Sequence, residues 1–108
     1  MITDERLTTF INSLESRDLP ILEEIEQEAL DANVPIIRKE TQSFLKVLLQ
    51  IHRPMRILEA GTAVGFSALL MNAYARRCHI TTIENYEKRI PIARENFRRA
   101  GKEEAITW

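Results

Sequence analysis

Two glycines, Gly61 and Gly65, separate a short apolar run from a helical one in the segment Arg56-Ile-Leu-Glu-Ala-Gly-Thr-Ala-Val-Gly-Phe-Ser67. A ligand can approach the backbone closely only where no Cβ atom intrudes, and glycine meets that need. The helix that begins near Gly65 also directs unpaired N–H groups towards the turn. The pattern therefore indicates a nucleotide-like ligand, although glycine also serves strand-to-helix turns that bind no ligand.

Two acids and a serine accompany this turn. Glu84 ends the second apolar run at the ~20-residue distance expected of a ribose-binding carboxylate. The alternative interpretation is that Glu84 is an acid at the N-terminus of the following helix. Glu59 directly precedes the turn, where it can fix the turn through backbone N–H groups, receive a ligand ammonium, or remain a solvated charge. Ser67, in the first turn of the helix, can donate to the ligand or bond the backbone.

Other chemistries find less support. Ala63 stands where a dinucleotide motif would place a second close glycine, so a nicotinamide-binding oxidoreductase is disfavoured. No Lys-Ser/Thr pair follows Gly65, which argues against a phosphate loop. Cys78, His52 and His79 are isolated from partners at metal-ligand or catalytic spacing, and we expect all three to be structural.

Composition limits the class of protein. The chain has 108 residues, 44% of them hydrophobic, and a formal net charge of −1, so no global field favours nucleic acid or an anionic membrane. The single cysteine cannot form an intrachain disulfide, which favours a reducing cytoplasm. No apolar run approaches the ~20 residues that span a bilayer, and no membrane partner is expected. The basic helix near the C-terminus is interpreted as a solvated face, with a phosphate-contacting patch as the alternative.

The hydrophobic periodicity of the sequence predicts the helices and strands that position these candidate site residues. It predicts helices over 4–16, from 20 to Asn33, and over 39–51, then strands 56–60 and 79–83 alternating with helices 67–77 and 88–100, and a third strand from 105. The second helix should expose its glutamates, Glu26 among them, and bury Ile21, Leu22, Ile25, Ala29 and Leu30. The third should bury Phe44, Leu45, Leu48 and Leu49. Strands that alternate with helices imply an α/β fold with a parallel sheet.

Three parallel strands are only half of a doubly wound sheet. The first strand of such a sheet is normally central, so Ile57 and Leu58 would lack a neighbour on one side. We therefore expect a sequence truncated after the third strand. Residues 1–53 would be N-terminal helices, and residues 54–108 the first half of a Rossmann-like cofactor-binding domain.

The turn Glu59-Ala-Gly-Thr-Ala-Val-Gly-Phe-Ser67 resembles the cofactor-binding motif of S-adenosylmethionine-dependent O-methyltransferases of the catechol and caffeoyl-CoA type. Thr81-Thr-Ile-Glu84 is similar to the second motif of that family, whose acid holds the ribose. Asn33-Val-Pro-Ile-Ile37 resembles the segment that closes over the cofactor. This segment, together with Thr62-Ala63, is similar to the bacterial branch that methylates 5-hydroxyuridine in tRNA. Phe66 departs from the family's frequent tyrosine.

The resemblance implies a class I methyltransferase fold and S-adenosyl-L-methionine as cofactor. Ile37 would contact the cofactor, Gly61 and Ser67 would line its methionine end, and Glu84 would bind its ribose; Glu59 completes the expected cofactor-binding set. The family's divalent metal (Mg²⁺) is held by an aspartate and an Asp-Asn pair on later strands. These positions are absent here, so the metal, the catalytic centre and a homodimer are expected only in a full-length parent. The alternative is a non-catalytic adenosine-ligand binding module that acts in an assembly.

Overall fold

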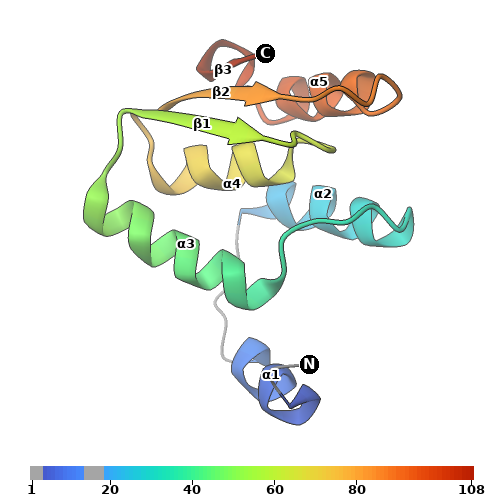
Figure 1. The fold of residues 1–108 in the computed structure, drawn as a ribbon, viewed down its shortest axis with the longest axis vertical. Coiled ribbons are helices and arrows are strands. Elements are labelled where there is room, and N and C mark those ends of the chain that lie inside the picture. The colour runs from blue at the N-terminus through green and yellow to red at the C-terminus, as the bar shows by residue number, and fades with distance from the viewer. Residues whose placement is uncertain (1–3, 14–18) are drawn as a thin grey trace.

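The computed structural model describes residues 4–13 and 19–108 (Figure 1). Its elements follow in the order α1 (Glu5–Ser13), α2 (Pro20–Asp31), α3 (Lys39–His52), β1 (Arg56–Ala60), α4 (Phe66–Tyr74), β2 (His79–Ile83), α5 (Ile90–Arg99), η1 (Glu103–Ala105) and β3 (Ile106–Thr107). The predicted alternation of strands and helices is confirmed. The end of the predicted first helix, residues 14–16, and the break after it at residues 17 and 18 lie outside the described residues.

The three strands form a parallel sheet in the order β1-β2-β3. Arg56 pairs with His79 and Ile80 pairs with Ile106. Within the described ranges β1 has a strand neighbour on one side only, and Leu58 is 72% exposed. The α/β class, the parallel sheet and the bounds of the first two strands are as predicted.

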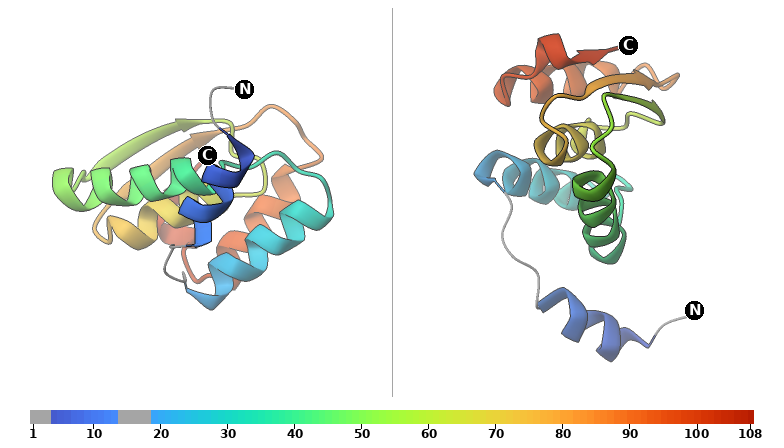
Figure 2. Two further views of the ribbon diagram at one scale, coloured as in Figure 1. Left: turned by 90° about the horizontal axis from the view of Figure 1, so that it is seen from below. Right: turned by 90° about the vertical axis from the view of Figure 1, so that its left-hand side faces the viewer.

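Helix α4 lies between the sheet and the helices α2 and α3. It contacts β2 on one side and both α2 and α3 on the other, so the helices that precede the sheet share its core. Leu22 and Ile25 of α2 belong to this core, as do Leu70 of α4 and Ile80 of β2. Helix α1 lies at the end of the molecule opposite β3 (Figures 1 and 2). In the described part of the chain, no helix is long and apolar enough to cross a membrane.

The buried face of α3 differs in part from the predicted one, although Leu49 is buried as expected. Phe44 and Leu48 are 68% and 48% exposed, whereas Gln42 and Lys46 are buried. The ammonium of Lys46 lies over the ring of Tyr74 in α4, 5.2 Å from its centroid, so its aliphatic stem packs where an apolar residue was expected. The prediction failed because apolar residues cover a wider arc of α3 than the core occupies.

The polar contact between α2 and α3 explains which faces meet. Glu26 of α2 is buried, contrary to prediction, and Leu30 is exposed. The Glu26 carboxylate accepts a hydrogen bond from Gln42 Nε2 (2.7 Å) and forms an ion pair with Lys39 Nζ (2.7 Å). Because a buried carboxylate requires such partners, this contact fixes the rotation of both helices.

Several element bounds also differ from the predicted ones. Helix α4 ends at Tyr74 instead of residue 77, and α5 begins at Ile90 instead of residue 88. Pro91 stands in the first turn of α5, where its missing N–H costs no hydrogen bond. The short η1 turn precedes β3, so the third strand starts at Ile106.

Candidate functional site

The glycine turn crosses the carboxyl ends of β1 and β2. The N–H groups of Gly61 and Thr62 donate to the carbonyl of Ile83 (2.8 and 3.2 Å), and the N–H of Gly65 donates to the carbonyl of Thr62 (2.8 Å). Gly61 has φ +96° and Gly65 has φ +87°, in the left-handed region that glycine enters without strain. The turn is thus anchored to the second strand as well as the first.

The two glycines have different surroundings. A Cβ atom at Gly65 would lie 2.5 Å from Cε1 of Phe97 in α5, so packing also requires glycine there. Nothing lies within 4 Å of a Cβ atom at Gly61. Gly65 therefore serves the close approach of α4 to α5, while Gly61 leaves open space beside the turn.

Glu84 fastens the turn from the end of β2. Its Oε1 accepts from the N–H of Ala63 (2.8 Å), and its Oε2 accepts from the N–H groups of Asn85 and Tyr86 (3.1 Å each). Ala63 has φ 48°, a strained value for a residue with a side chain, and this hydrogen bond helps to hold it there. Because α5 begins only at Ile90, Glu84 does not act as an acid in its first turn.

These hydrogen bonds predict an acid-sensitive contribution to stability. The N–H donors of Tyr86 and then Ala63 hold the pKa of Glu84 below its ordinary value of 4.5. The stabilisation is therefore complete above about pH 4.5 and is lost as the pH falls through the lower folded pKa. We expect Tm to fall less steeply in Glu84→Gln than in the parent between about pH 6 and pH 3.

A matched control uses an exposed acid. Glu95 also has a lowered pKa, caused by its hydrogen bond to Arg98, but both side chains of that pair are exposed. Since solvent screens exposed pairs, Glu95→Gln should leave the acid slope of Tm close to that of the parent. Equal slopes for Glu84→Gln and the parent would show that the Glu84 bonds contribute nothing to folding.

Glu59 is bonded through hydroxyl groups. Ser67 Oγ donates to one of its oxygens, and Thr82 Oγ1 donates to the other (2.7 Å). Thr82 Oγ1 and Thr62 Oγ1 are 2.6 Å apart, and since the Thr82 proton is directed at the carboxylate, Thr62 is the donor of this bond. Glu59 therefore helps to hold the turn, as one of its expected roles required. Its hydrogen bonds come from side-chain hydroxyl groups, whereas backbone N–H donors were expected.

A hollow of about 230 Å³ lies beside the turn, lined by the α2–α3 loop on one side and the start of α4 on the other. Ile37, Gly61 and Ser67 all line it. The carbonyl of Ile37 accepts from Nε2 of the buried Gln42 (2.9 Å), which positions the loop. The first helical bond of α4 runs from Leu69 to Gly65 (3.1 Å), so the preceding N–H groups have no helical acceptor.

Three of the five predicted site residues therefore meet at one hollow, while Glu59 and Glu84 hold the turn that forms its wall. Sequence reasoning missed Thr62, Thr82 and Asn96. Asn96 Nδ2, from α5, donates to the carbonyl of Val64 (2.8 Å). Thr82 could have been found, because it is a polar residue in an apolar run, whereas nothing local to Asn96 indicates its contact.

The described residues provide neither a cluster of metal ligands nor a reactive thiol. Across residues 4–13 and 19–108, no three His, Cys, Asp or Glu side chains gather where they could hold a metal ion. These residues therefore do not fit a divalent metal site, and no metal-dependent step is assigned to them. Cys78 is buried, and burial raises the pKa of its thiol, which suits a structural residue.

The fold and the turn define an α/β protein with a glycine-bordered hollow at the carboxyl ends of parallel strands. The family model described as O-methyltransferase matches residues 12–108. The chain belongs to this O-methyltransferase family.

Solved structures agree in fold. A protein from Staphylococcus aureus, provisionally identified as a caffeoyl-CoA O-methyltransferase, is 26% identical with TM-score 0.88; the match covers 95% of this chain and 49% of that one. The O-methyltransferase from Bacillus cereus, in complex with SAH (S-adenosylhomocysteine), is 28% identical with TM-score 0.78, over 94% of this chain and 48% of that one. The SAH-bound methyltransferase PaMTH1 from Podospora anserina shares the fold at 22% identity and TM-score 0.85, over 99% and 50%. The chain spans about half the length of these structures.

Proposed function

We propose that this chain forms part of the S-adenosylmethionine site of an O-methyltransferase. The observation that carries the proposal is the hollow in which Ile37 faces Gly61 and Ser67 beside the start of α4. Its volume, about 230 Å³, is below the ~300–1,000 Å³ of whole ligand sites, so it suits one end of the cofactor. The SAH complex of the Bacillus cereus relative supports this choice of ligand.

The hydrogen bonds define what each side chain offers to the cofactor. Ser67 donates its proton to Glu59, so its hydroxyl oxygen presents lone pairs and accepts from the ligand's ammonium group. A carboxylate has about four acceptor positions, and Glu84 uses three of them on backbone N–H groups. Glu84 therefore has one position left for a ribose hydroxyl. Ile37 covers the methionine end.

Calorimetric titration of the chain tests the cofactor. S-adenosylhomocysteine should bind and NADH should not, because the turn lacks the dinucleotide glycine pattern. Glu84→Ala should weaken the binding of S-adenosylhomocysteine by about 1.5 to 3 kcal/mol, the range for hydrogen bonds to charged groups. Binding of NADH in preference to S-adenosylhomocysteine would refute the assignment.

We further propose that residues 1–53 and 54–108 are the N-terminal helices and first half-domain of a longer, cytoplasmic and homodimeric enzyme, whose divalent metal is held by residues beyond this sequence. The resemblance of the Asn33–Ile37 segment and of Thr62-Ala63 supports 5-hydroxyuridine in tRNA as the methyl acceptor. Transfer of a labelled methyl group by the longer protein to tRNA, with catechol as the competing acceptor, tests this choice. A longer protein that binds the cofactor and transfers no methyl group would favour the non-catalytic binding module.

A further inference from the structure

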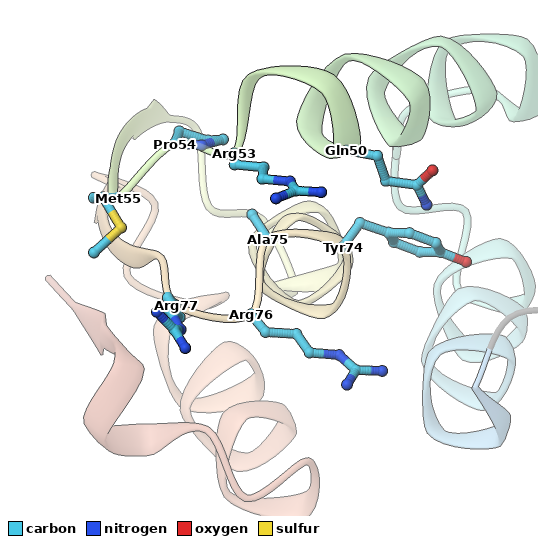
Figure 3. A pocket seen from close by; sticks show the side chains of 8 residues that line it. All are labelled: Gln50, Arg53, Pro54, Met55, Tyr74, Ala75, Arg76 and Arg77. Carbon is cyan, nitrogen blue, oxygen red and sulfur yellow. The ribbon is translucent and has the colours of Figure 1, made fainter.

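A second hollow lies at the opposite end of the sheet from the glycine turn, where β1 and β2 begin. Its volume is about 690 Å³, within the ~300–1,000 Å³ typical of small-molecule sites. Figure 3 shows Arg53, Arg76 and Arg77 around it, with Met55 and Tyr74 also in its lining. Among the described residues, three cationic side chains and no carboxylate line this hollow.

The three arginines come from two loops that the backbone holds together. Arg53 follows α3, and its N–H donates to the carbonyl of Leu49 (2.8 Å). The loop after α4 carries the other two arginines and leads into β2, where the N–H of His79 donates to the carbonyl of Met55 (2.9 Å). Because each loop precedes a strand of the same sheet, the positive charges are held near one another.

These arginines differ from Arg38, Arg98 and Arg99, which pair with carboxylates. In the described part of the chain, none of the three forms an ion pair with a carboxylate. By contrast, Arg98 pairs with Glu95 (2.6 Å) and Arg99 pairs with Glu28 (2.9 Å), so carboxylates neutralise much of the basic face of α5. The formal net charge is −1, and the attraction of this hollow for anions is therefore local.

The backbone of Arg53 is strained. It has φ 50° and ψ 58° at the C-cap of α3, a left-handed conformation that glycine usually supplies at helix ends. Strain kept at a residue with a side chain points to a use for that side chain. An alternative is that the arginines only compensate the dipoles at the ends of α3 and α4. Compensation of the dipoles does not require the arginines of the two loops to line the same hollow, as Arg53, Arg76 and Arg77 do.

We propose that Arg53, Arg76 and Arg77 form an anion site that binds phosphate groups of a polyanionic ligand. Guanidinium groups bind phosphate oxygens through paired, charge-assisted hydrogen bonds, and several of them can share one chain of phosphates. Two sources offer this chemistry: a free polyphosphate or the phosphodiester chain of RNA. The site lies at the opposite end of the sheet from the proposed cofactor site and shares no lining residue with it. Its ligand also differs, because S-adenosylmethionine carries no phosphate.

The test measures binding of tripolyphosphate by calorimetry and of a labelled single-stranded RNA oligonucleotide by anisotropy, both at low salt. Arg53→Gly should weaken both by about tenfold, the effect of one charge-assisted hydrogen bond. The same variant should raise Tm by a few degrees, since glycine relieves the strained φ. This opposite pair of effects separates lost binding from misfolding. Lys102→Gln, with the same loss of charge at an exposed position outside the lining of the hollow, is the control.

Each outcome decides the proposal. Weaker binding in Arg53→Gly and in the Arg76→Gln/Arg77→Gln variant, with Lys102→Gln unchanged, supports the site. Within that result, RNA bound more tightly than tripolyphosphate identifies the phosphodiester chain as the source, and the reverse identifies a free polyphosphate. No binding of either probe, unchanged binding in Arg53→Gly, equal losses in Lys102→Gln, or full competition by S-adenosylhomocysteine overturns it.

Discussion

Gly65→Ala is expected to lower the free energy of unfolding by about 2 to 5 kcal/mol. A side chain at φ +87° costs about 1 to 2 kcal/mol. Its Cβ would also lie 2.5 Å from Phe97, whose ring is buried and lies 5.7 Å from that of Trp108, so overpacking adds about 1 to 3 kcal/mol. Urea unfolding followed by circular dichroism measures the change through the midpoint at constant slope.

Two variants separate strain from overpacking. Gly101 has φ +67°, and a methyl group added there would have nothing within 4 Å, so Gly101→Ala should cost only the strain, about 1 to 2 kcal/mol. Phe97→Leu should be less harmful in the Gly65→Ala background than alone, because it removes the ring atoms that clash. Equal losses at Gly65 and Gly101, with no coupling to Phe97, would show that the contact with α5 does not restrict this position.

Glu59→Ala is the second change with a large expected effect. It removes the acceptor of Ser67 and Thr82, and it leaves the buried hydroxyl chain from Thr62 without its end point. We expect the free energy of unfolding to fall by about 2 to 3 kcal/mol, in the range of lost hydrogen bonds to a charged group. The affinity for S-adenosylhomocysteine should fall at least ~10-fold, because Ser67 and the turn lose their fixed positions.

The control for Glu59 is Glu87→Ala, which removes an exposed acid from the loop before α5. It should change stability by less than ~0.5 kcal/mol, as surface substitutions usually do. Glu59→Gln should fall between the two, since its amide oxygen accepts one hydroxyl and its NH₂ group opposes the other. The hydroxyl network would be unimportant if Glu59→Ala and Glu87→Ala behaved alike in both measurements.

The elements of this fold could largely be predicted from the sequence because the strands are short apolar runs bounded by polar turns. The bounds 56–60 and 79–83 agree with β1 and β2. The rotation of α3 could not be predicted, since Phe44 and Leu48 are as apolar as the buried Leu49. The rotation seen is favoured by the buried carboxylate of Glu26, whose partner Gln42 is 16 residues away along the chain.

The candidate site was predicted in part for a similar reason. Gly61, Ser67 and Ile37 occupy positions that local pattern and resemblance indicate, and they meet at one hollow. The different roles of Glu59 and Glu84 depend on which hydrogen-bond donors each carboxylate reaches across the turn. Glu84 reaches the N–H of Ala63, 21 residues away, and Glu59 reaches Thr82, 23 residues away. Such contacts become visible only when both strands are in place.

The strands lie in the sheet in the same order as in the chain, which allows them to pair one after another during synthesis. Each strand pairs with the one that left the ribosome before it: His79 of β2 meets Arg56, and Ile106 of β3 meets Ile80. The helix that must cover each new pair lies between the two strands in the chain. Loop closures of some two dozen residues are therefore enough to pair β1 with β2 and β2 with β3.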